Sequence, residues 1–245
     1  MKVIFIHGWA TNSKVWLYQK PILEALRAVA IDLPGHVGAD KWYESSFRPG
    51  IEKLQGLIGG EDTVAIGWSL GGNLLLSLAI QGCENLKGIV LIGSSPSFIK
   101  RPHFSHGQSR TLVMRMKKDL KKAFHITLDR FYRTNFSEAE RKNSAYQNHL
   151  EVLRSTQEGL IKDDMIHILD TLIAEDMVKD VSSINIPALL IHGSLDIVCP
   201  VGASYYLLKE LPIGELMVMD GAGHCPFITR HKEFNAAVKG FIDRI

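Results

Sequence analysis

Short apolar runs alternate with amphipathic stretches along the chain, and this alternation limits the possible folds more than any other feature. The runs end in glycine or turn residues and lack a polar residue at every second position. Such runs are typical of strands that are buried on both faces of a parallel sheet. Helical patterns occupy residues 69–81 and 201–211, so the sequence predicts an α/β fold with a doubly wound, mainly parallel sheet. The six predicted strands are residues 2–6, 29–33, 63–66, 88–92, 187–191 and 215–219.

A long charged segment between the fourth and fifth predicted strands interrupts this alternation. It contains three stretches with a helical pattern, at residues 112–131, 137–158 and 162–178. Because the segment is too long for a loop, we expect a helical lid at residues 97–183, inserted into a core of residues 1–96 and 184–245. The lid would follow the carboxyl end of a strand, which is the edge where α/β sheets bind their ligands.

The predicted lid has a strong excess of basic residues. Residues 100–150 contain twelve Lys and Arg but only four Asp and Glu, a net charge of +8 in a chain whose overall charge is +2. This segregation indicates either a basic face for an anionic partner or a solvated helical surface. Nucleic acid is not expected as that partner, because the chain has no nucleic-acid-binding motif and is nearly neutral overall.

Composition excludes several other classes of protein. A hydrophobic content of 46% with a small net charge excludes intrinsic disorder. No apolar run approaches the roughly 18 residues of a membrane span, and no secretory signal is visible. We therefore expect a cytoplasmic protein that does not associate with a membrane. The three cysteines, Cys83, Cys199 and Cys225, lack metal-ligand spacing, which argues against disulfides and against a metal site.

One motif points to nucleophilic catalysis. The sequence Gly67-Trp68-Ser69-Leu70-Gly71 follows a predicted buried strand and begins a predicted helix. This is the strand–turn–helix context of the nucleophile elbow, in which small residues permit a tight turn and the serine is exposed in a strained conformation. Ser69 is therefore the predicted nucleophile, with a structural serine as the alternative.

A serine nucleophile needs a base, and the base needs a carboxylate that orients it. His224 lies in a glycine-rich segment just after the last predicted strand, and Asp196 follows the preceding one. The chain order Ser69, Asp196, His224 is that of the α/β-hydrolases. Asp220 is a weaker candidate for the acid, and His192 is interpreted as a core histidine.

The tetrahedral intermediate of such a reaction needs two backbone N–H groups that form an oxyanion hole. Leu70, the residue after the nucleophile, is expected to supply one of them. Trp9, in the loop after the first strand, is expected to supply the other, and its indole could also form a wall of the acyl pocket. The alternative role for Trp9 is simple hydrophobic packing. His36 is interpreted as a loop residue with structural contacts.

Five motifs spread over nearly the whole chain carry a resemblance to a known family. They are His7-Gly8-Trp9, Asp32-Leu33-Pro34-Gly35, Gly67-Trp68-Ser69-Leu70-Gly71-Gly72, Ser94-Ser95-Pro96 and Gly221-Ala222-Gly223-His224-Cys225-Pro226-Phe227-Ile228. Together they resemble the α/β-hydrolase superfamily, and more narrowly the pimeloyl-[acyl-carrier protein] methyl ester carboxylesterases of biotin synthesis. Members of that family usually have further strands before the His-Gly-Trp strand. This chain starts at that strand, so we expect six strands, all parallel.

The resemblance also implies a partner and a pocket. Enzymes of this family remove a methyl group from an ester carried on acyl carrier protein, an acidic partner that they bind with basic lid residues. The implied pocket residues, besides Trp9, are Phe131, Tyr132, Arg133, Thr134 and Asn135. The implied carrier contacts are Arg130, Arg133, Arg141 and Lys142. Ordinary helix packing remains the alternative for Phe131 and Tyr132.

The predicted reaction is therefore a two-step ester hydrolysis through an acyl-enzyme, with no metal or organic cofactor, by a monomeric enzyme. Three alternatives remain open. A broad-specificity short-chain carboxylesterase without a carrier partner shares every catalytic feature, and a carbon–carbon bond hydrolase uses the same triad. The same fold can also serve as a ligand receptor without catalysis, which an intact serine, acid and histidine set disfavours.

Overall fold

A computed structural model describes residues 1–36, 38 and 40–245 of the chain. Its centre is a six-stranded sheet in the order β2-β1-β3-β4-β5-β6, and every neighbouring pair is parallel. The prediction of a doubly wound sheet with six parallel strands is confirmed. The strands are β1 Lys2–Ile6, β2 Val29–Ile31, β3 Thr63–Trp68, β4 Leu86–Ile92, β5 Ala188–Gly193 and β6 Gly214–Met219.

Apolar side chains in register run across the centre of the sheet. Phe5 of β1 pairs with Ile66 of β3, Ile66 with Val90 of β4, and Val90 with Leu189 of β5. All four are buried, which explains why their strands have no polar alternation in the sequence. Burial of each such side chain contributes about 1.5–3 kcal/mol, so this row forms part of the stable core.

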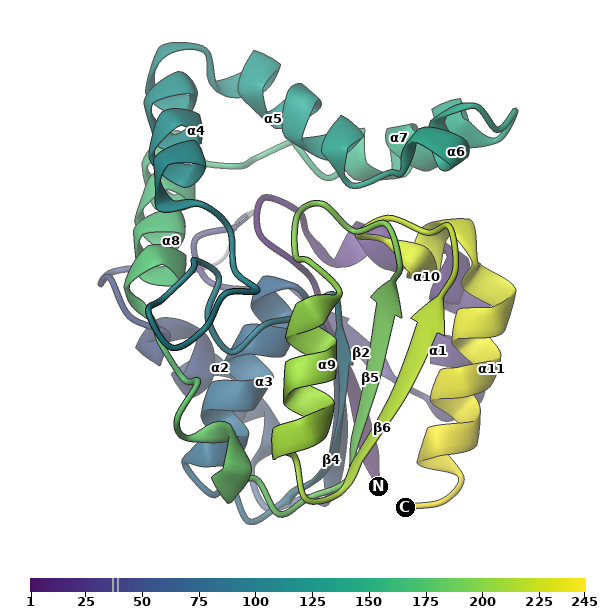
Figure 1. Ribbon diagram of the computed structural model, residues 1–245. Coiled ribbons are helices and arrows are strands. Elements are labelled where there is room, and N and C mark those ends of the chain that lie inside the picture. Colours follow the sequence, from purple (N-terminus) through teal and green to yellow (C-terminus); the bar gives the residue numbers. More distant parts are fainter. Residues whose placement is uncertain (37, 39) are drawn as a thin grey trace.

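Helices cover both faces of the sheet (Figure 1). Helices α2, α3 and α9 lie on one face, while α1 and α11 lie on the other, together with the short helices η1 and α10. Both chain termini lie at the opposite end of the sheet from helices α4–α7. The bounds are η1 Ser13–Gln19, α1 Lys20–Leu26, α2 Arg48–Ile58, α3 Leu70–Ile80, η2 Val181–Ser183, α9 Gly202–Glu210, α10 Pro226–Thr229 and α11 His231–Ile242.

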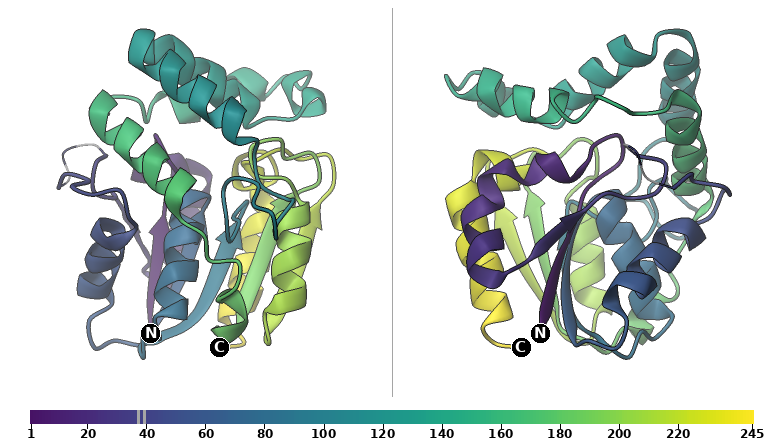
Figure 2. Two further views of the ribbon diagram at one scale, coloured as in Figure 1. Left: turned by 60° about the vertical axis from the view of Figure 1, so that its left-hand side comes forward. Right: turned by 180° about the vertical axis from the view of Figure 1, so that it is seen from behind.

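Five α-helices between β4 and β5 form an insertion that extends over the carboxyl ends of the strands (Figures 1 and 2). Helix α8 runs beside α4 and returns the chain toward the core. No helix in the described part of the chain is long and apolar enough to cross a bilayer. The helices of the insertion are α4 Arg110–Lys122, α5 Phe124–Thr134, α6 Glu138–Arg141, α7 Tyr146–Arg154 and α8 Lys162–Ala174.

The insertion is more broken than the sequence predicts. The expected helix 112–131 is two helices, because Ala123 adopts φ −146° and ψ 70° between them. No Gly or Pro marks this break, so periodicity alone could not locate it. The expected helix 137–158 is also two short helices, and the first begins at a capping box between Ser137 and Glu140. The third helix ends at Ala174, four residues earlier than expected.

Candidate active site

The turn between β3 and α3 holds Ser69 in a strained conformation. Its φ is 52° and its ψ is −112°, values that residues other than glycine rarely adopt. A Cβ on Gly67 would lie 2.5 Å from the Gly71 backbone, and one on Gly71 would lie 2.5 Å from the Ile6 carbonyl oxygen. The turn therefore requires glycine at both positions, and it leaves the Ser69 side chain half-buried at the carboxyl edge of the sheet.

His224 and Asp196 form a buried hydrogen-bonded pair at the same edge. The Nδ1 atom of His224 lies 2.6 Å from Oδ2 of Asp196. A carboxylate only accepts hydrogen bonds, so Nδ1 carries a proton, and in the neutral ring Nε2 has a free lone pair. Within the described residues, Nε2 is buried and has no hydrogen-bond partner. An unpartnered imidazole nitrogen of this kind can accept a proton from a nucleophile.

The elbow and the histidine are connected through neighbouring residues. The indole N–H of Trp68, which precedes Ser69, donates to the His224 carbonyl at 2.9 Å. The backbone N–H of Ser69 donates to the Ile92 carbonyl at 2.8 Å. Gly93, the next residue, lies so close to the imidazole that a Cβ there would be 2.9 Å from Nδ1. The structure thus brings the surroundings of Ser69 against the His224–Asp196 pair.

Asp196 is held as an anion. Its Oδ1 accepts the backbone N–H groups of Val198 and Cys199, both at 2.8 Å. Burial acts to raise the pKa of Asp196, but the charge of His224 and the hydrogen bonds from His192 and His224 lower that pKa below its ordinary value. The carboxylate can therefore fix the imidazole tautomer and stabilise an imidazolium.

His192 has a role that the sequence did not reveal. It is fully buried, as expected of a core histidine, and it contacts the Ser204 hydroxyl at 2.6 Å and the Cys199 carbonyl at 2.7 Å. Its Nε2 also lies 3.2 Å from Oδ2 of Asp196, the oxygen that His224 contacts. The only sequence signal for this contact was its position in the strand that leads to Asp196.

The other acid candidate lies away from this pair. Asp220 is exposed, and its carboxylate accepts a hydrogen bond from the Ser194 hydroxyl at 3.0 Å, as a turn aspartate does. Among the described residues, no group of three or more His, Cys, Asp or Glu side chains is placed to hold a metal ion.

The loop after β1 has the features of an oxyanion loop. Leu70 begins α3, so its N–H has no acceptor within the helix. The N–H of Trp9 forms no hydrogen bond within the described part of the chain. The next residue, Ala10, has a φ of 56°, and its N–H donates to Nε2 of His36 at 3.3 Å. His36 therefore makes the structural contact expected of it.

A second buried histidine braces the same loop. His7 Nε2 accepts the N–H of Leu33 at 3.0 Å, and its Nδ1 lies 2.8 Å from the Gly8 carbonyl, to which it donates. The rings of His7 and His36 meet edge to face at 4.7 Å. Burial lowers the pKa of His7 to about 4, so both hydrogen bonds are made by a neutral ring at neutral pH.

Trp9 and Phe131 connect this loop to the insertion. The Trp9 indole N–H donates to the Met165 carbonyl of α8 at 2.9 Å, and its ring meets Phe131 of α5 edge to face at 5.0 Å. Phe131 and Thr134 also line an apolar groove of about 160 Å³ at the border of insertion and core. Its other lining residues are Phe98, Gln108, Leu112, Val113, Met116, Ile197 and Val198.

Four of the expected pocket residues do not line this groove: Trp9, which contacts the groove residue Phe131, and also Tyr132, Asn135 and Arg133. Tyr132 is fully buried, and its hydroxyl donates to the Ala10 carbonyl at 2.6 Å. Asn135 is also buried, and its side-chain amide donates to the Phe131 carbonyl at 2.8 Å. Arg133 is exposed and pairs with Asp129 at 2.8 Å. Residues 131 and 134 lie three positions apart on one face of α5, whereas residues 132 and 133 lie on other faces and Asn135 follows the last residue of the helix.

The expected carrier contacts are exposed, but three of the four are ion-paired. Arg130 lies 3.7 Å from Asp119, Arg133 pairs with Asp129, and Lys142 lies 2.9 Å from Glu138. Arg141 is exposed and borders a cavity next to the Asp196 loop. Helix α4 carries further exposed cations that form no ion pair within the described residues, namely Arg110, Arg115, Lys118, Lys121 and Lys122.

Comparisons with known proteins agree with this geometry. Among similar sequences, the pimeloyl-[acyl-carrier protein] methyl ester esterase of Nitrosomonas europaea is 28% identical over 244 residues, covering 95% of this chain and 92% of that protein. The protein of the same name from Aromatoleum aromaticum is 29% identical and covers 94% of each chain.

Solved structures show the same fold. An esterase from Exiguobacterium antarcticum superposes with a TM-score of 0.91 at 20% identity, over 99% of this chain and 92% of that one. An enol-lactonase from Burkholderia xenovorans superposes with a TM-score of 0.87 at 17% identity, over 99% of this chain and 91% of that one. The family model of the alpha/beta hydrolase fold matches residues 2–231. This chain belongs to the α/β hydrolase fold family.

Proposed function

We propose that this chain is a serine carboxylesterase that hydrolyses the methyl ester of a pimeloyl group carried on acyl carrier protein, a step of biotin biosynthesis. The observation that carries the esterase part is the buried His224–Asp196 pair, whose free Nε2 lies at the same sheet edge as the strained Ser69. The pimeloyl and carrier parts rest on the relatives named above and on the charge of the insertion.

The proposed mechanism begins when Ser69 attacks the ester carbonyl and His224 Nε2 takes the hydroxyl proton. Asp196 holds the ring and stabilises the imidazolium. The N–H groups of Trp9 and Leu70 donate to the tetrahedral oxyanion. The intermediate collapses with loss of methanol, which receives the proton from His224. Water, deprotonated by the same nitrogen, then attacks the acyl-enzyme and releases the carboxylic acid and free Ser69.

The apolar groove suits the methylene chain of such a substrate. Its lining contains no charged side chain, so it favours aliphatic groups and disfavours a free carboxylate. The groove includes Ile197 and Val198, which directly follow the catalytic aspartate in the chain. In the proposed binding mode the aliphatic chain runs along this groove past Phe131, whose ring contacts Trp9 of the proposed oxyanion loop.

The exposed cations of the insertion are the proposed docking surface for the carrier. Arg115, Lys118 and Lys122 are spaced by three and four residues on α4, so they share one face of the helix. Unpaired cations attract an acidic protein more strongly than cations already neutralised by a carboxylate, because each presents its full charge. Helix α4 thus joins the four residues inferred from the resemblance, Arg130, Arg133, Arg141 and Lys142.

A comparison of two substrates tests this proposal. Turnover of pimeloyl methyl ester is measured with the acyl group free and with it attached to acyl carrier protein, each at low and at high salt. The proposal predicts a large preference for the carrier-bound ester that decreases with salt, because screening weakens steering by exposed charges. Equal or better turnover of the free ester would instead indicate a broad-specificity short-chain carboxylesterase. Failure of a fluorophosphonate probe to label Ser69 would indicate a receptor.

A further inference from the structure

The loop that carries His224 is held by a segment of the insertion far away in sequence. Residues 221–225, here called the histidine loop, contact residues 135–140, which follow α5 and begin α6. The N–H of His224 itself donates to the Asn135 carbonyl at 2.7 Å. The Ser137 hydroxyl donates to the Gly221 carbonyl at 2.7 Å. A Cβ on Gly223 would lie 2.5 Å from the Asn135 carbonyl oxygen, so the two backbones are in direct contact.

The Glu140 carboxylate accepts hydrogen bonds from three segments that meet at this contact. Its Oε2 accepts the N–H of Gly223 at 2.9 Å and the N–H of Ser137 at 2.8 Å. Its Oε1 accepts the hydroxyl of Thr229, which lies in α10 just after the histidine loop. One carboxylate therefore connects the start of α6, the residue before His224 and the helix that follows it. Hydrogen bonds to an ionised acceptor are roughly twice as strong as neutral ones.

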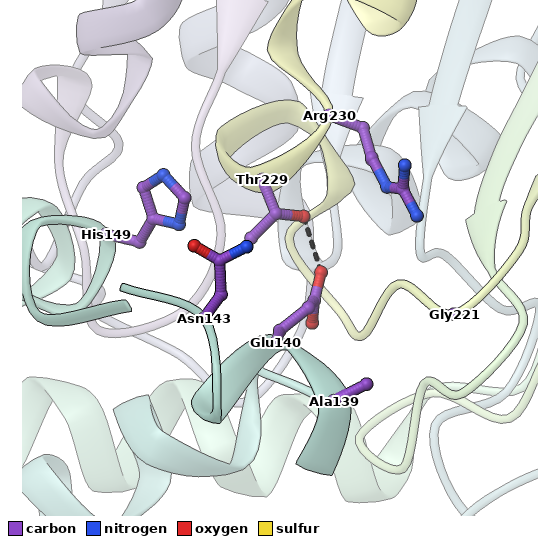
Figure 3. A pocket seen from close by; sticks show the side chains of 7 residues that line it. All are labelled: Ala139, Glu140, Asn143, His149, Gly221, Thr229 and Arg230. Atoms are coloured by element: carbon purple, nitrogen blue, oxygen red, sulfur yellow. Dashed lines mark hydrogen bonds between the residues drawn. The ribbon is translucent and has the colours of Figure 1, made fainter. Parts of the chain in front are cut away.

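A cavity lies beside this contact. Figure 3 shows Glu140 reaching from α6 toward Thr229, and the Glu140–Thr229 bond crosses the gap between the insertion and the core. The cavity has a volume of about 310 Å³ and is also lined by Asn143, His149 and Arg230. At the edge of this open space the hydrogen bonds of Glu140 connect the insertion to the core, beside the backbone contact of Asn135 with Gly223.

His224 is consequently held at three points, one on its ring and two on its backbone. Asp196 holds its ring, the Trp68 indole holds its carbonyl, and residue Asn135 holds its N–H. Two of these supports belong to the sheet core and one to the insertion. A movement of α6 that breaks the Glu140 bonds would weaken the support that the insertion provides, because Glu140 joins Gly223, the residue before His224, to α6.

We propose that Glu140 is a positioning residue for His224, through Gly223 and Thr229, so that the catalytic base is in place only while α6 is docked on the histidine loop. This inference rests on the proposed function, in which His224 is the base. A displacement of about 1 Å of a reacting group can lower a rate on the order of 100-fold. Loss of the Glu140 carboxylate should therefore act on kcat rather than on substrate binding.

The test compares three variants with a small free ester as substrate. Glu140→Ala is expected to lower kcat on the order of 100-fold, with KM changed by less than about threefold. Glu140→Gln, whose amide oxygen can still accept the Gly223 N–H, is expected to recover most of kcat. Glu138→Ala is the matched control, because Glu138 lies on the same short helix with its side chain 78% exposed and pairs with Lys142.

Several outcomes would overturn the inference. The first is that Glu140→Ala has the wild-type kcat. The second is that the melting temperature of Glu140→Ala falls while kcat of its folded fraction stays at the wild-type value. If Glu140→Ala does not fold, Thr229→Val removes only the outer bond and must lower kcat of the folded enzyme, assayed well below its melting temperature. His224→Ala is assayed in parallel. Activity in His224→Ala would contradict the proposed function, whereas an inactive His224→Ala beside a fully active Glu140→Ala would contradict the positioning role alone.

Discussion

The hydroxyl of Tyr132 donates to the backbone carbonyl of Ala10 at 2.6 Å, and this bond joins helix α5 of the insertion to the loop that carries Trp9. Both residues are fully buried. Ala10 also has a positive φ and its N–H donates to His36, so both backbone polar groups of this residue are held. The insertion therefore supports the proposed oxyanion hole as well as covering the sheet edge.

Removal of this hydroxyl should weaken both stability and catalysis. Tyr132→Phe leaves the buried Ala10 carbonyl without its donor, which costs on the order of 1–3 kcal/mol of unfolding free energy. We expect kcat to fall as well, because the Trp9 N–H loses its fixed position. Urea denaturation and steady-state kinetics measure the two effects. Tyr43→Phe, which removes an exposed hydroxyl bonded to Glu52, is the control and should change little.

Replacement of the nucleophile should abolish turnover and leave the fold intact. Ser69→Ala is expected to lower kcat by about 10⁴-fold or more, since residues of a triad act as a unit. The melting temperature should not fall, because Ser69 is half-buried and strained. Ser77→Ala, on the same helix α3, serves as the control and should retain activity. Substantial turnover by Ser69→Ala would reject the serine mechanism.

The two acid candidates can be separated by matched substitutions. Asp196→Asn keeps the shape of the side chain but no longer stabilises the imidazolium or fixes its tautomer, so kcat should fall by about 10³- to 10⁴-fold. Asp220→Asn should leave kcat near the wild-type value, because Asp220 is exposed and bonded to Ser194. The reverse result would assign the acid to Asp220.

Stability should decrease in mild acid because of the buried histidines. The pKa of His7 is about 4 in the folded protein against an ordinary value of 6.5, and burial also lowers the pKa of His36. Between those pH values the unfolded chain binds protons that the folded chain does not. The unfolding free energy should therefore fall as pH decreases from about 6.5 to about 4, on the order of 3 kcal/mol for His7. Urea denaturation across this range measures the fall, which must be shallower in His7→Gln.

Reversal of charge on α4 should affect the carrier-bound ester alone. The double variant Lys118→Glu and Lys122→Glu is expected to raise KM for that substrate by about tenfold or more at low salt, and less at high salt. Turnover of the free ester should not change. Lys232→Glu, on the exposed side of α11 and far from α4 in Figure 1, is the control. An equal effect of both reversals would show that only net charge matters.

The sheet and the elbow were predictable because their sequence patterns are enforced by close packing. Strands such as Leu86–Ile92 are buried almost throughout, so they can hold no polar alternation, and their runs are visible in the sequence. Gly67 and Gly71 admit no Cβ because backbone atoms lie 2.5 Å away. In both cases a local requirement leaves a local signal, and the predicted strands lie within two residues of the observed ones.

The insertion was less predictable because its contacts are between residues distant in sequence. The break at Ala123 carries no Gly or Pro, and the side chain of Tyr132 points to Ala10, 122 residues away in the chain. In the sequence, Glu140 is one acidic residue among many basic ones and nothing marks it as a contact residue, although it bonds to Gly223 and Thr229. In the core, the contact of His192 with Asp196 was also missed, because the three residues between them form a turn that no sequence signal marks.

The attachment of the insertion at both the Ala10 loop and the histidine loop has a consequence for protein engineering. Exchange of the insertion between related hydrolases is an obvious route to new substrate preferences. In this chain such an exchange would also replace the donor to Ala10 and the acceptors of His224 and Gly223. A chimera should therefore retain residues 131–140 from the recipient and graft only the segments on either side.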